Sequence, residues 1–306
     1  MPIYNSDGIQ LDSYYNSDGS ELNYAYDAEG NVIFTKGDQP EPITPSVDYT
    51  TYIYSQVWAS KSITSTQDFT LYDGKVFWAS KSGNASVPAD CYIFDLATGD
   101  QIKTTTIHSG HANSISMDFP ILYASTGYTP PLVYINELTS DFTATLVKTL
   151  YINDGCTVLD CCIDETDKTV LWTHGKGGPS AETDIVSKWD LTDLTDNGDD
   201  TYTPRLIQSV RTPKPETLFD QANMYFQGCT FHDGMLWYPT WYSGVTGRIV
   251  AVNPSNGNVE YIISTETTTE VEGVEFYPDA QAEGGYVMYM GFQGMMMRRY
   301  SFARLT

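Results

Sequence analysis

A short apolar cassette recurs five times along this chain, and it constrains the fold more than any other feature of the sequence. Each copy is two apolar residues followed by an aromatic one: Val76-Phe77-Trp78, Ile121-Leu122-Tyr123, Val170-Leu171-Trp172, Met235-Leu236-Trp237 and Val287-Met288-Tyr289. The aromatic residues are separated by 45, 49, 65 and 52 residues. Repeats of roughly 40–50 residues built from strands are typical of β-propellers, and a fully apolar run suits a strand buried on both faces. The sequence therefore predicts an all-β fold, a five-bladed β-propeller of four-stranded antiparallel blades with the cassette as the second strand of each.

The last predicted blade lacks a strand. Its strand-like segments are residues 274–277, 286–290 and Met296–Phe302, and the sequence then stops at Thr306. A ring of sheets that closes on itself leaves no free edge. The segment Tyr52–Trp58 is rich in strand-forming residues but has no partner strand beside it in the sequence. We therefore expect Tyr52–Trp58 to close the propeller as the fourth strand of the last blade.

The longest interval between cassettes contains an acidic insertion at residues 193–200, between the outer strands of the predicted third blade. Its composition resembles that of a calcium loop, but it lacks the alternating acidic positions and the closing glutamate of an EF-hand. We expect a solvated hairpin tip and no cofactor, with a structural Ca²⁺ ion in this segment as the alternative.

Residues 1–34 carry a separate, smaller repeat. Tyr-Asn-Ser-Asp-Gly occurs at residues 4–8 and 15–19 and Tyr-Asp-Ala-Glu-Gly at 26–30, a spacing of eleven residues. Asp-Gly and Glu-Gly pairs favour tight turns between short strands, and such hairpins need partners to bury a core. Three prolines within residues 35–47 then favour an extended linker. We expect an attachment or oligomerisation repeat at 1–34, a linker at 35–47 and a propeller at 48–306.

The composition of the chain argues against several classes of partner. There are 39 acidic and 16 basic residues, a formal net charge of −23. Phosphate-bearing partners require Lys and Arg, so we expect no nucleic acid and no anionic membrane among the partners. The chain shows neither a secretion signal nor a run of about 18 uncharged apolar residues, so we expect synthesis in the cytoplasm and no membrane insertion. The five cysteines follow no disulfide or metal pattern and are expected to be small buried residues.

Polar residues open each of the predicted innermost strands. Aligned on the turn that follows, five of them fall at comparable depths, within a residue or two: Gln67, Asn113, Asp160, Gln227 and Glu272. The innermost strands of a propeller line a central channel, where ligands commonly bind. Because amides offer both donors and acceptors, a ring of amides and carboxylates favours a hydroxyl-rich ligand. The alternative is that these groups only hydrogen-bond to channel waters and exposed strand ends.

The sequence gives little support to a metal site. His111 precedes one inner strand, His174 follows a cassette, and His232 ends another inner strand. His111 and His232 should therefore lie at opposite ends of the channel, so a joint three-histidine site is not expected. The chain contains no HExxH, paired CxxC, Walker loop or GxSxG elbow.

Glycoside hydrolysis is the main catalytic alternative. That reaction needs two carboxyl groups on either side of a sugar, and Asp160 and Glu272 are the candidates for the acid and the base. Five-bladed propellers host such enzymes, usually with three carboxylates at the channel mouth. Asp68 is the candidate for the third.

Two parts of the sequence resemble a known group of proteins. The Tyr-Asn-Ser-Asp-Gly and Tyr-Asp-Ala-Glu-Gly-Asn-Val-Ile-Phe repeats resemble those opening tail-associated proteins of phages and prophages of Gram-positive and gut bacteria. The run Gly110-His111-Ala112-Asn113-Ser114 resembles five-bladed phage receptor-binding propellers, a group related to the teichoic-acid biosynthesis protein C family. The resemblance implies a virion tail component that engages cell-surface glycan as a trimer or larger homo-oligomer, and a ligand-binding role for His111 and Asn113. The insertion at 193–200 departs from the family pattern.

Three functions are therefore carried forward. The first is a non-catalytic binding module, attached to other tail proteins by the N-terminal repeat and recognising host cell-surface polysaccharide. The second is a glycan-cleaving enzyme that uses Asp160 and Glu272. The third is a purely structural virion protein.

Overall fold

The computed structural model describes residues 24–26, 32–35, 52–58, 66–81, 88–127, 129–156, 159–176, 183–222, 224–265, 267–282 and 285–302. The chain divides into two compact units, residues 1–44 and 45–306. In the first unit, β1 (Tyr24–Tyr26) pairs antiparallel with β2 (Val32–Thr35). This pair brackets the third copy of the N-terminal repeat. The predictions for the first two copies and for nearly all of the linker fall outside the described residues.

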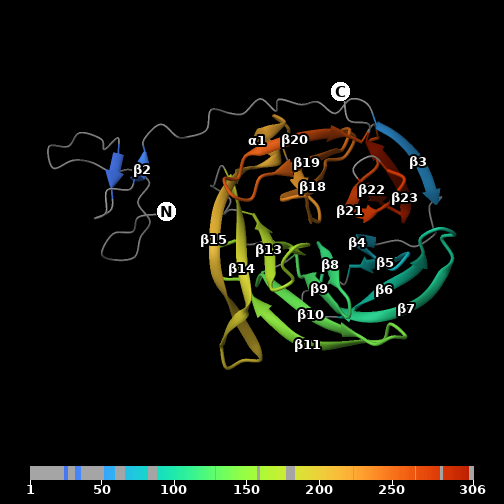
Figure 1. Cartoon of the computed structure of the whole chain (residues 1–306), viewed down its shortest axis with the longest axis horizontal. Coiled ribbons are helices and arrows are strands. Elements are labelled where there is room, and N and C mark those ends of the chain that lie inside the picture. Colours follow the sequence, from blue (N-terminus) through green and yellow to red (C-terminus); the bar gives the residue numbers. More distant parts are fainter. Residues whose placement is uncertain are drawn as a thin grey trace. The chain divides into compact units, whose positions relative to one another are not determined.

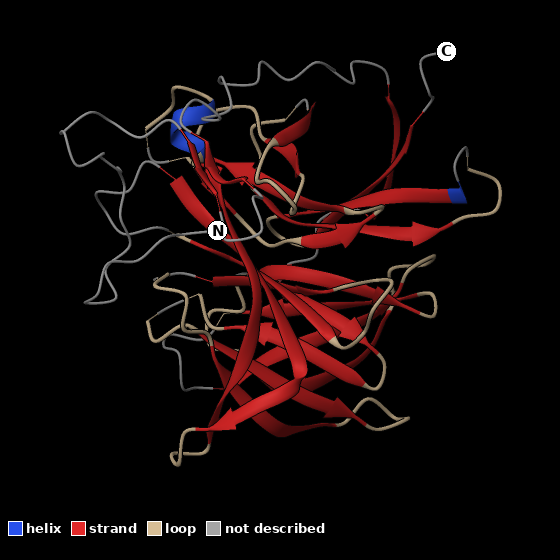
Figure 2. Cartoon of the chain, turned by 60° about the vertical axis from the view of Figure 1, so that its left-hand side comes forward, coloured by secondary structure: helices blue, strands red, loops and turns tan. Residues whose placement is uncertain are grey.

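The second unit consists almost entirely of strands (Figure 2), which confirms the all-β class. Its described strands form four hydrogen-bonded sheets, one of which has eight strands. For description we divide that sheet into two halves and number the resulting sets as sheets 1 to 5. Sheet 1 comprises β4 (Thr66–Tyr72), β5 (Lys75–Ser80), β6 (Pro88–Asp95) and β7 (Gln101–His108). Sheet 2 comprises β8 (Ile115–Asp118), β9 (Ile121–Ser125), β10 (Leu132–Leu138) and β11 (Ala144–Tyr151). Sheet 3 comprises β12 (Leu159–Ile163), β13 (Val170–Gly175), β14 (Thr183–Asp196) and β15 (Thr201–Pro213).

Sheets 4 and 5 complete the set. Sheet 4 comprises β16 (Tyr225–Phe226), β17 (Thr230–His232), β18 (Met235–Trp241), β19 (Arg248–Val252) and β20 (Val259–Ser264). Sheet 5 comprises β21 (Val271–Pro278), β22 (Tyr286–Phe292) and β23 (Met296–Phe302), together with β3 (Tyr52–Trp58). Within each sheet, consecutive strands pair antiparallel, except that β16 and β17 of sheet 4 both pair with β18, which is thus the second strand in the pairing order.

Sheets 2 and 3 are joined into one eight-stranded sheet. The outer strands β11 and β15 pair in parallel over two residues, Thr149 with Thr201 and Leu150 with Tyr202. At the other edge, β8 and β12 also touch, because the Ser116 hydroxyl accepts a hydrogen bond from the Ile163 amide at 3.1 Å. The eight strands therefore come close to forming a closed barrel.

Five hydrophobic clusters fill the spaces between the sheets. Each cluster draws its buried residues from two sheets that follow one another in sequence, and one cluster joins sheet 5 to sheet 1. The sheets accordingly succeed one another around a common centre, with β4, β8 and β21 on the inside and β3, β7, β11 and β15 on the outside (Figure 1). Apolar surface is thus removed from water on both faces of every sheet, which is the dominant favourable term in folding.

The five cassettes lie in β5, β9, β13, β18 and β22, the second strand of each sheet, as the sequence predicts. One residue assignment was wrong. Tyr123, Trp172 and Tyr289 pack against the following sheet, whereas Trp78 packs against the preceding one and Phe77 against the following one. Phe77 is therefore the structural counterpart of the aromatic residue in sheet 1.

The predicted closing strand is confirmed. β3 pairs antiparallel with β23 from Trp58 with Met297 to Tyr52 with Phe302. Trp58 also reaches sheet 1, where its indole Nε1 donates to the Leu96 carbonyl at 2.9 Å and its ring lies 5.4 Å from that of Phe94. A segment that precedes sheet 1 in sequence thereby fastens sheet 5 to sheet 1.

The long interval in sheet 3 has two causes, of which the sequence indicated one. The acidic insertion lengthens the β14–β15 hairpin, whose exposed tip follows Asp196. The second cause is the connection from sheet 3 to sheet 4, which contains the one-turn helix α1 (Pro215–Leu218). No helix in the described part of the chain is long and apolar enough to cross a membrane.

Candidate functional site

The inner strands β4, β8, β12, β17 and β21 can be aligned through their partners in the second strands. The residues opposite the cassette aromatics are Thr70, Ser116, Cys162, Thr230 and Glu275. We use the term "mouth" for the end of the common centre at which these inner strands begin.

Counting back from those five residues toward the mouth places the predicted ring in two layers. Three positions back lie Gln67, Asn113, Leu159, Gln227 and Glu272. Two positions back lie Asp68, Ser114, Asp160, Gly228 and Gly273. By this count four of the five predicted residues fall at one position, and Asp160 falls one residue further along its strand. The count is not a depth, because Gln67 and Asp68 together lie opposite Ala79 and Glu272 is an extra residue between Val271 and Gly273.

Irregular pairing marks this level in several sheets. A register shift between Thr66 and Phe69 places Gln67 and Asp68 in a bulge of β4, and another places Glu272 in a bulge of β21. In sheet 4, residues 227–229 separate β16 from β17, and both of these short strands pair with β18. Bulges redirect side chains and are over-represented next to active sites. At the mouth, β4 and β21 thus depart from regular strand geometry.

Asp68 extends from sheet 1 across the common centre. One of its carboxylate oxygens, Oδ2, accepts a hydrogen bond from the Ile115 amide of sheet 2 at 2.9 Å. The rest of the Asp68 carboxyl group lies against the backbone of two glycines. A Cβ atom added to Gly228 would lie 2.9 Å from Asp68 Cγ, and one added to Gly273 would lie 1.9 Å from Asp68 Oδ1. Burial raises the pKa of Asp68 well above its usual range. The two glycines therefore make room for a carboxyl group that contacts sheets 1, 2, 4 and 5.

Replacing Gly273 with alanine is expected to destabilise the fold by about 1–3 kcal/mol, because the new methyl group would overlap the Asp68 carboxyl group. Urea unfolding followed by tryptophan fluorescence measures this change. If the two residues are in contact, combining Gly273→Ala with Asp68→Ala should cost less than the sum of the single changes, by about 1 kcal/mol or more. Strict additivity would contradict the proposed contact.

Asp160 belongs to a buried polar network. The Asn113 Nδ2 amide donates to Asp160 Oδ1. His174 Nδ1 lies 3.4 Å from Asp160 Oδ2, and His174 Nε2 lies 3.3 Å from Asp184 Oδ2. Burial alone would lower the pKa of His174, but hydrogen bonds and charge from the two aspartates outweigh it and raise the pKa to about 9. A protonated imidazole between two carboxylates therefore holds Asp160 in place beside Asn113.

A second polar group joins sheets 4 and 5. Gln227 Nε2 donates to Glu270 Oε1 at 2.6 Å, and Gln293 Nε2 donates to Glu270 Oε2 at 3.1 Å. Glu272 is 3 % exposed, and burial, together with the charge of Glu270, raises its pKa well above the usual range. One layer below, Glu275 accepts hydrogen bonds from Thr230 at 2.8 Å and Thr70 at 3.2 Å.

The two remaining predicted residues lie at the edge of this arrangement. Gln67 turns back to its own strand, where its Nε2 donates to the Thr66 carbonyl at 2.7 Å. His111 and Asn113 both approach Gly127, since a Cβ there would lie 3.1 Å and 2.9 Å from their Cβ atoms. Burial, with a contribution from Lys81, lowers the pKa of His111 to about 4. His111 is therefore neutral at physiological pH.

The opposite end of the common centre has a different character. His232 Nδ1 lies 2.9 Å from Glu165 Oε2 of sheet 3, and its ring stacks on Phe276 with centroids 4.1 Å apart. His111 and His232 are therefore at opposite ends, as the sequence indicates. Among the described residues, no group of three or more His, Cys, Asp or Glu side chains is arranged to hold a metal ion.

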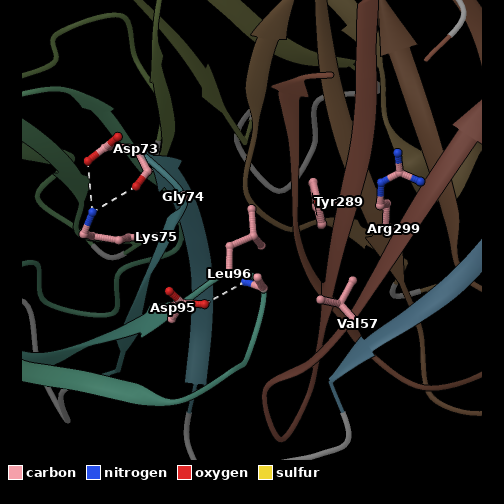
Figure 3. A pocket seen from close by; sticks show the side chains of 9 residues that line it. Val57, Asp73, Gly74, Lys75, Asp95, Leu96, Tyr289 and Arg299 are labelled. Carbon is pink, nitrogen blue, oxygen red and sulfur yellow. Dashed lines mark hydrogen bonds and ion pairs between the residues drawn. The ribbon is translucent and has the colours of Figure 1, made fainter. Parts of the chain in front are cut away.

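A cavity of about 580 Å³ lies away from the mouth, at the seam between sheets 1 and 5. Figure 3 shows Lys75 and Asp95 of sheet 1 on one side of it and Tyr289 and Arg299 of sheet 5 on the other, with Val57 of the closing strand nearby. Lys75 is held by the carboxylate of Asp73 at 3.0 Å. None of the six residues predicted to bind the ligand lines this cavity.

Comparison with known proteins identifies the fold but not the activity. No protein-family model matches the sequence, and no curated protein matches it significantly. The glutaminyl cyclase of Myxococcus xanthus superposes with a TM-score of 0.53 at 12 % identity, covering 82 % of this chain and 98 % of that one. A tail fiber of Staphylococcus aureus phage P68 superposes with a TM-score of 0.48 at 13 % identity, covering 83 % of this chain and 53 % of that one. The first likeness shows that the two chains share a fold, and the second is too weak to carry an inference.

Proposed function

We propose that residues 48–306 form a five-bladed β-propeller that binds carbohydrate at the mouth, and that the protein is a non-catalytic, tail-associated virion component. The observation that carries the binding proposal is the set of amide and carboxyl side chains that meet there. Asn113 contacts Asp160, Gln227 contacts Glu270, and Glu272, which follows Glu270, lies in the bulge of β21. Such groups match the alternating donors and acceptors of sugar hydroxyls.

The propeller assignment is supported by the ring of sheets and its closure. Five sheets in sequence order have five interfaces between them, including one from sheet 5 back to sheet 1. The β3–β23 pairing supplies the fourth strand of sheet 5. In this interpretation the parallel contact between β11 and β15 is a local bridge between two blades, limited to two residue pairs.

The virion role is supported by the resemblance of the N-terminal repeats to those of phage and prophage tail-associated proteins. In this proposal the repeat at residues 1–34 attaches the propeller to other tail proteins and assembles it into a homo-oligomer, such as a trimer. The ligand is then a polysaccharide of the host cell surface.

Glycoside hydrolysis is the second candidate, because the environments of the two carboxyl groups differ. Burial raises the pKa of both groups, but hydrogen bonds from His174 and Asn113 oppose the rise at Asp160, whereas the charge of Glu270 adds to it at Glu272. A pair of carboxyl groups in unlike environments is what an acid and a base require. In this alternative Glu272 is the acid and Asp160 the base.

One experiment separates these candidates. Purified cell-wall polysaccharide from candidate hosts is immobilised, and both retention of the full-length protein and release of reducing ends are followed. Retention without cleavage is expected, and Gln227→Ala should weaken retention about tenfold, equivalent to one hydrogen bond in a largely buried site. The matched control is Gln101→Ala on the exposed outer strand β7.

Other outcomes of that experiment decide against the binding proposal. Release of reducing ends that is lost in Asp160→Asn and in Glu272→Gln would establish the enzyme instead. If the protein is retained on none of the polysaccharides, the purely structural virion role is the candidate that remains.

A further inference from the structure

We propose that the mouth selects a carbohydrate that carries a protonated amine, and that Glu272 is the residue that meets this amine. The inference rests on the proposed carbohydrate-binding function and names the chemical class of its ligand. The inference follows from a comparison of the buried carboxyl groups at the mouth: some accept hydrogen bonds from protein groups and others lack a donor.

Glu272 is almost completely buried, but no described residue donates a hydrogen bond to it. Its neighbour Glu270 differs, since both carboxylate oxygens of Glu270 accept from glutamine amides. The bulge in β21 removes Glu272 from the regular pairing with β22. A buried carboxyl group without a donor costs free energy unless it is neutral or a ligand supplies the donor.

Asp68 provides a second, independent indication. It is 2 % exposed, and its Oδ1 atom has no hydrogen-bond partner among the described residues. That oxygen lies against Gly273, the residue after Glu272. Asp68 is therefore a second buried carboxyl group with an oxygen that lacks a donor. Burial favours the neutral form of such groups, but once ionised a carboxylate only accepts, and an ammonium group then supplies three donors and a positive charge.

The charges that face Glu272 favour a cation over a neutral donor. Glu270 on the same segment and Tyr225 of β16 lie close enough to interact electrostatically with Glu272, and the charge of Lys81 after β5 opposes that of Glu270. His111 is neutral at physiological pH. Since burial raises the pKa of Glu272, binding of an amine should displace a proton from the carboxyl group and leave an ion pair.

A pair of oligosaccharides with the same backbone tests the inference. Chitosan hexamer carries free amines, and chitohexaose carries N-acetyl groups at the same positions. By calorimetry the full-length protein should bind the chitosan hexamer about tenfold more tightly or better, the value of a charge-assisted hydrogen bond. The enthalpy measured in two buffers of different ionisation heat should report proton release on binding of the amine only.

The variant Glu272→Gln keeps the shape of the side chain and removes its charge. It should lose both the preference for the amine and the proton release, while Glu137→Gln, at the exposed position of β10, should change neither. Glu137→Gln also controls for non-specific attraction, because the chain carries a net charge of −23. Thermal melting of both variants checks that each is folded.

Several results would overturn the inference. Equal affinity for the two oligosaccharides would show that the mouth does not select the amine. A preference that Glu272→Gln retains would show that Glu272 does not meet the amine. Equal losses in Glu272→Gln and Glu137→Gln would show general charge attraction. If neither oligosaccharide binds but host polysaccharide is retained, the amine selectivity fails and the carbohydrate-binding proposal stands.

Discussion

Replacing Trp58 with alanine is expected to destabilise the second unit by about 3–5 kcal/mol, the usual cost of removing a buried aromatic side chain. Trp58 is 4 % exposed and belongs to the cluster between sheets 5 and 1. Its loss would leave a cavity at that seam and would remove the donor to the Leu96 carbonyl. Chemical denaturation of the full chain at neutral pH measures the change.

Three further variants distinguish closure of the ring of sheets from ordinary packing of a core residue. Trp58→Phe keeps most of the apolar contact but lacks the indole N–H, so it should cost about 1–2 kcal/mol. A chain that begins at residue 45 should keep the stability of the second unit, whereas one that begins at residue 59 lacks β3 and should not fold cooperatively. A Trp58→Ala variant within about 0.5 kcal/mol of the wild type would contradict the closing role, because that is the range of surface substitutions.

The positions of the strands could be predicted because burial on both faces leaves a distinct pattern. A run such as Val170-Leu171-Trp172 has no polar member, since a sheet stands on either side of it. The same fact explains the error in sheet 1. Phe77 and Trp78 are both fully buried, so the sequence gives no sign of which one faces which neighbour. The closing strand could be predicted because an edge strand without a partner is unfavourable.

The candidate site was predictable only in part. Gln67, Asn113, Gln227 and Glu272 occupy equivalent positions when residues are counted from the turns, and Asp160 is one residue away. Bulges in β4 and β21 displace Gln67 and Glu272 from the depth that this count gives. Sequence patterns do not indicate where such bulges fall.

Contacts between distant segments escaped prediction altogether. From the sequence, His174 was considered only as a possible metal ligand. Its partners are Asp160 on β12 and Asp184 on β14, the two strands that flank β13. Asp68 was considered as a third carboxylate. Its place against Gly228 and Gly273 depends on the closure of the ring, which no local pattern encodes.

Raising the pH through 9 is expected to weaken the fold through His174. Its pKa is about 9 in the folded protein and ordinarily 6.5, so folding favours the protonated imidazole. The stabilisation is therefore fully present below pH 6.5 and is lost as the pH rises through about 9, a change of about 3 kcal/mol. Denaturant unfolding at several pH values between about 6 and 9.5 measures this loss.

A comparison with His174→Gln isolates this contribution from other titrating groups. The buried carboxyl groups with raised pKa values, such as Asp68 and Glu272, also make stability fall with rising pH, but they are present in both proteins. At about pH 6 the variant should be less stable by about 3–5 kcal/mol, because two buried aspartates lose their cation. That deficit should shrink by about 3 kcal/mol at about pH 9.5, where the wild-type imidazole is neutral too. His232→Gln, at the opposite end of the common centre, is the matched control and should show no such convergence. A deficit for His174→Gln that stays constant across this range would mean that His174 is neutral in the folded protein and that Asp160 is held by hydrogen bonds alone.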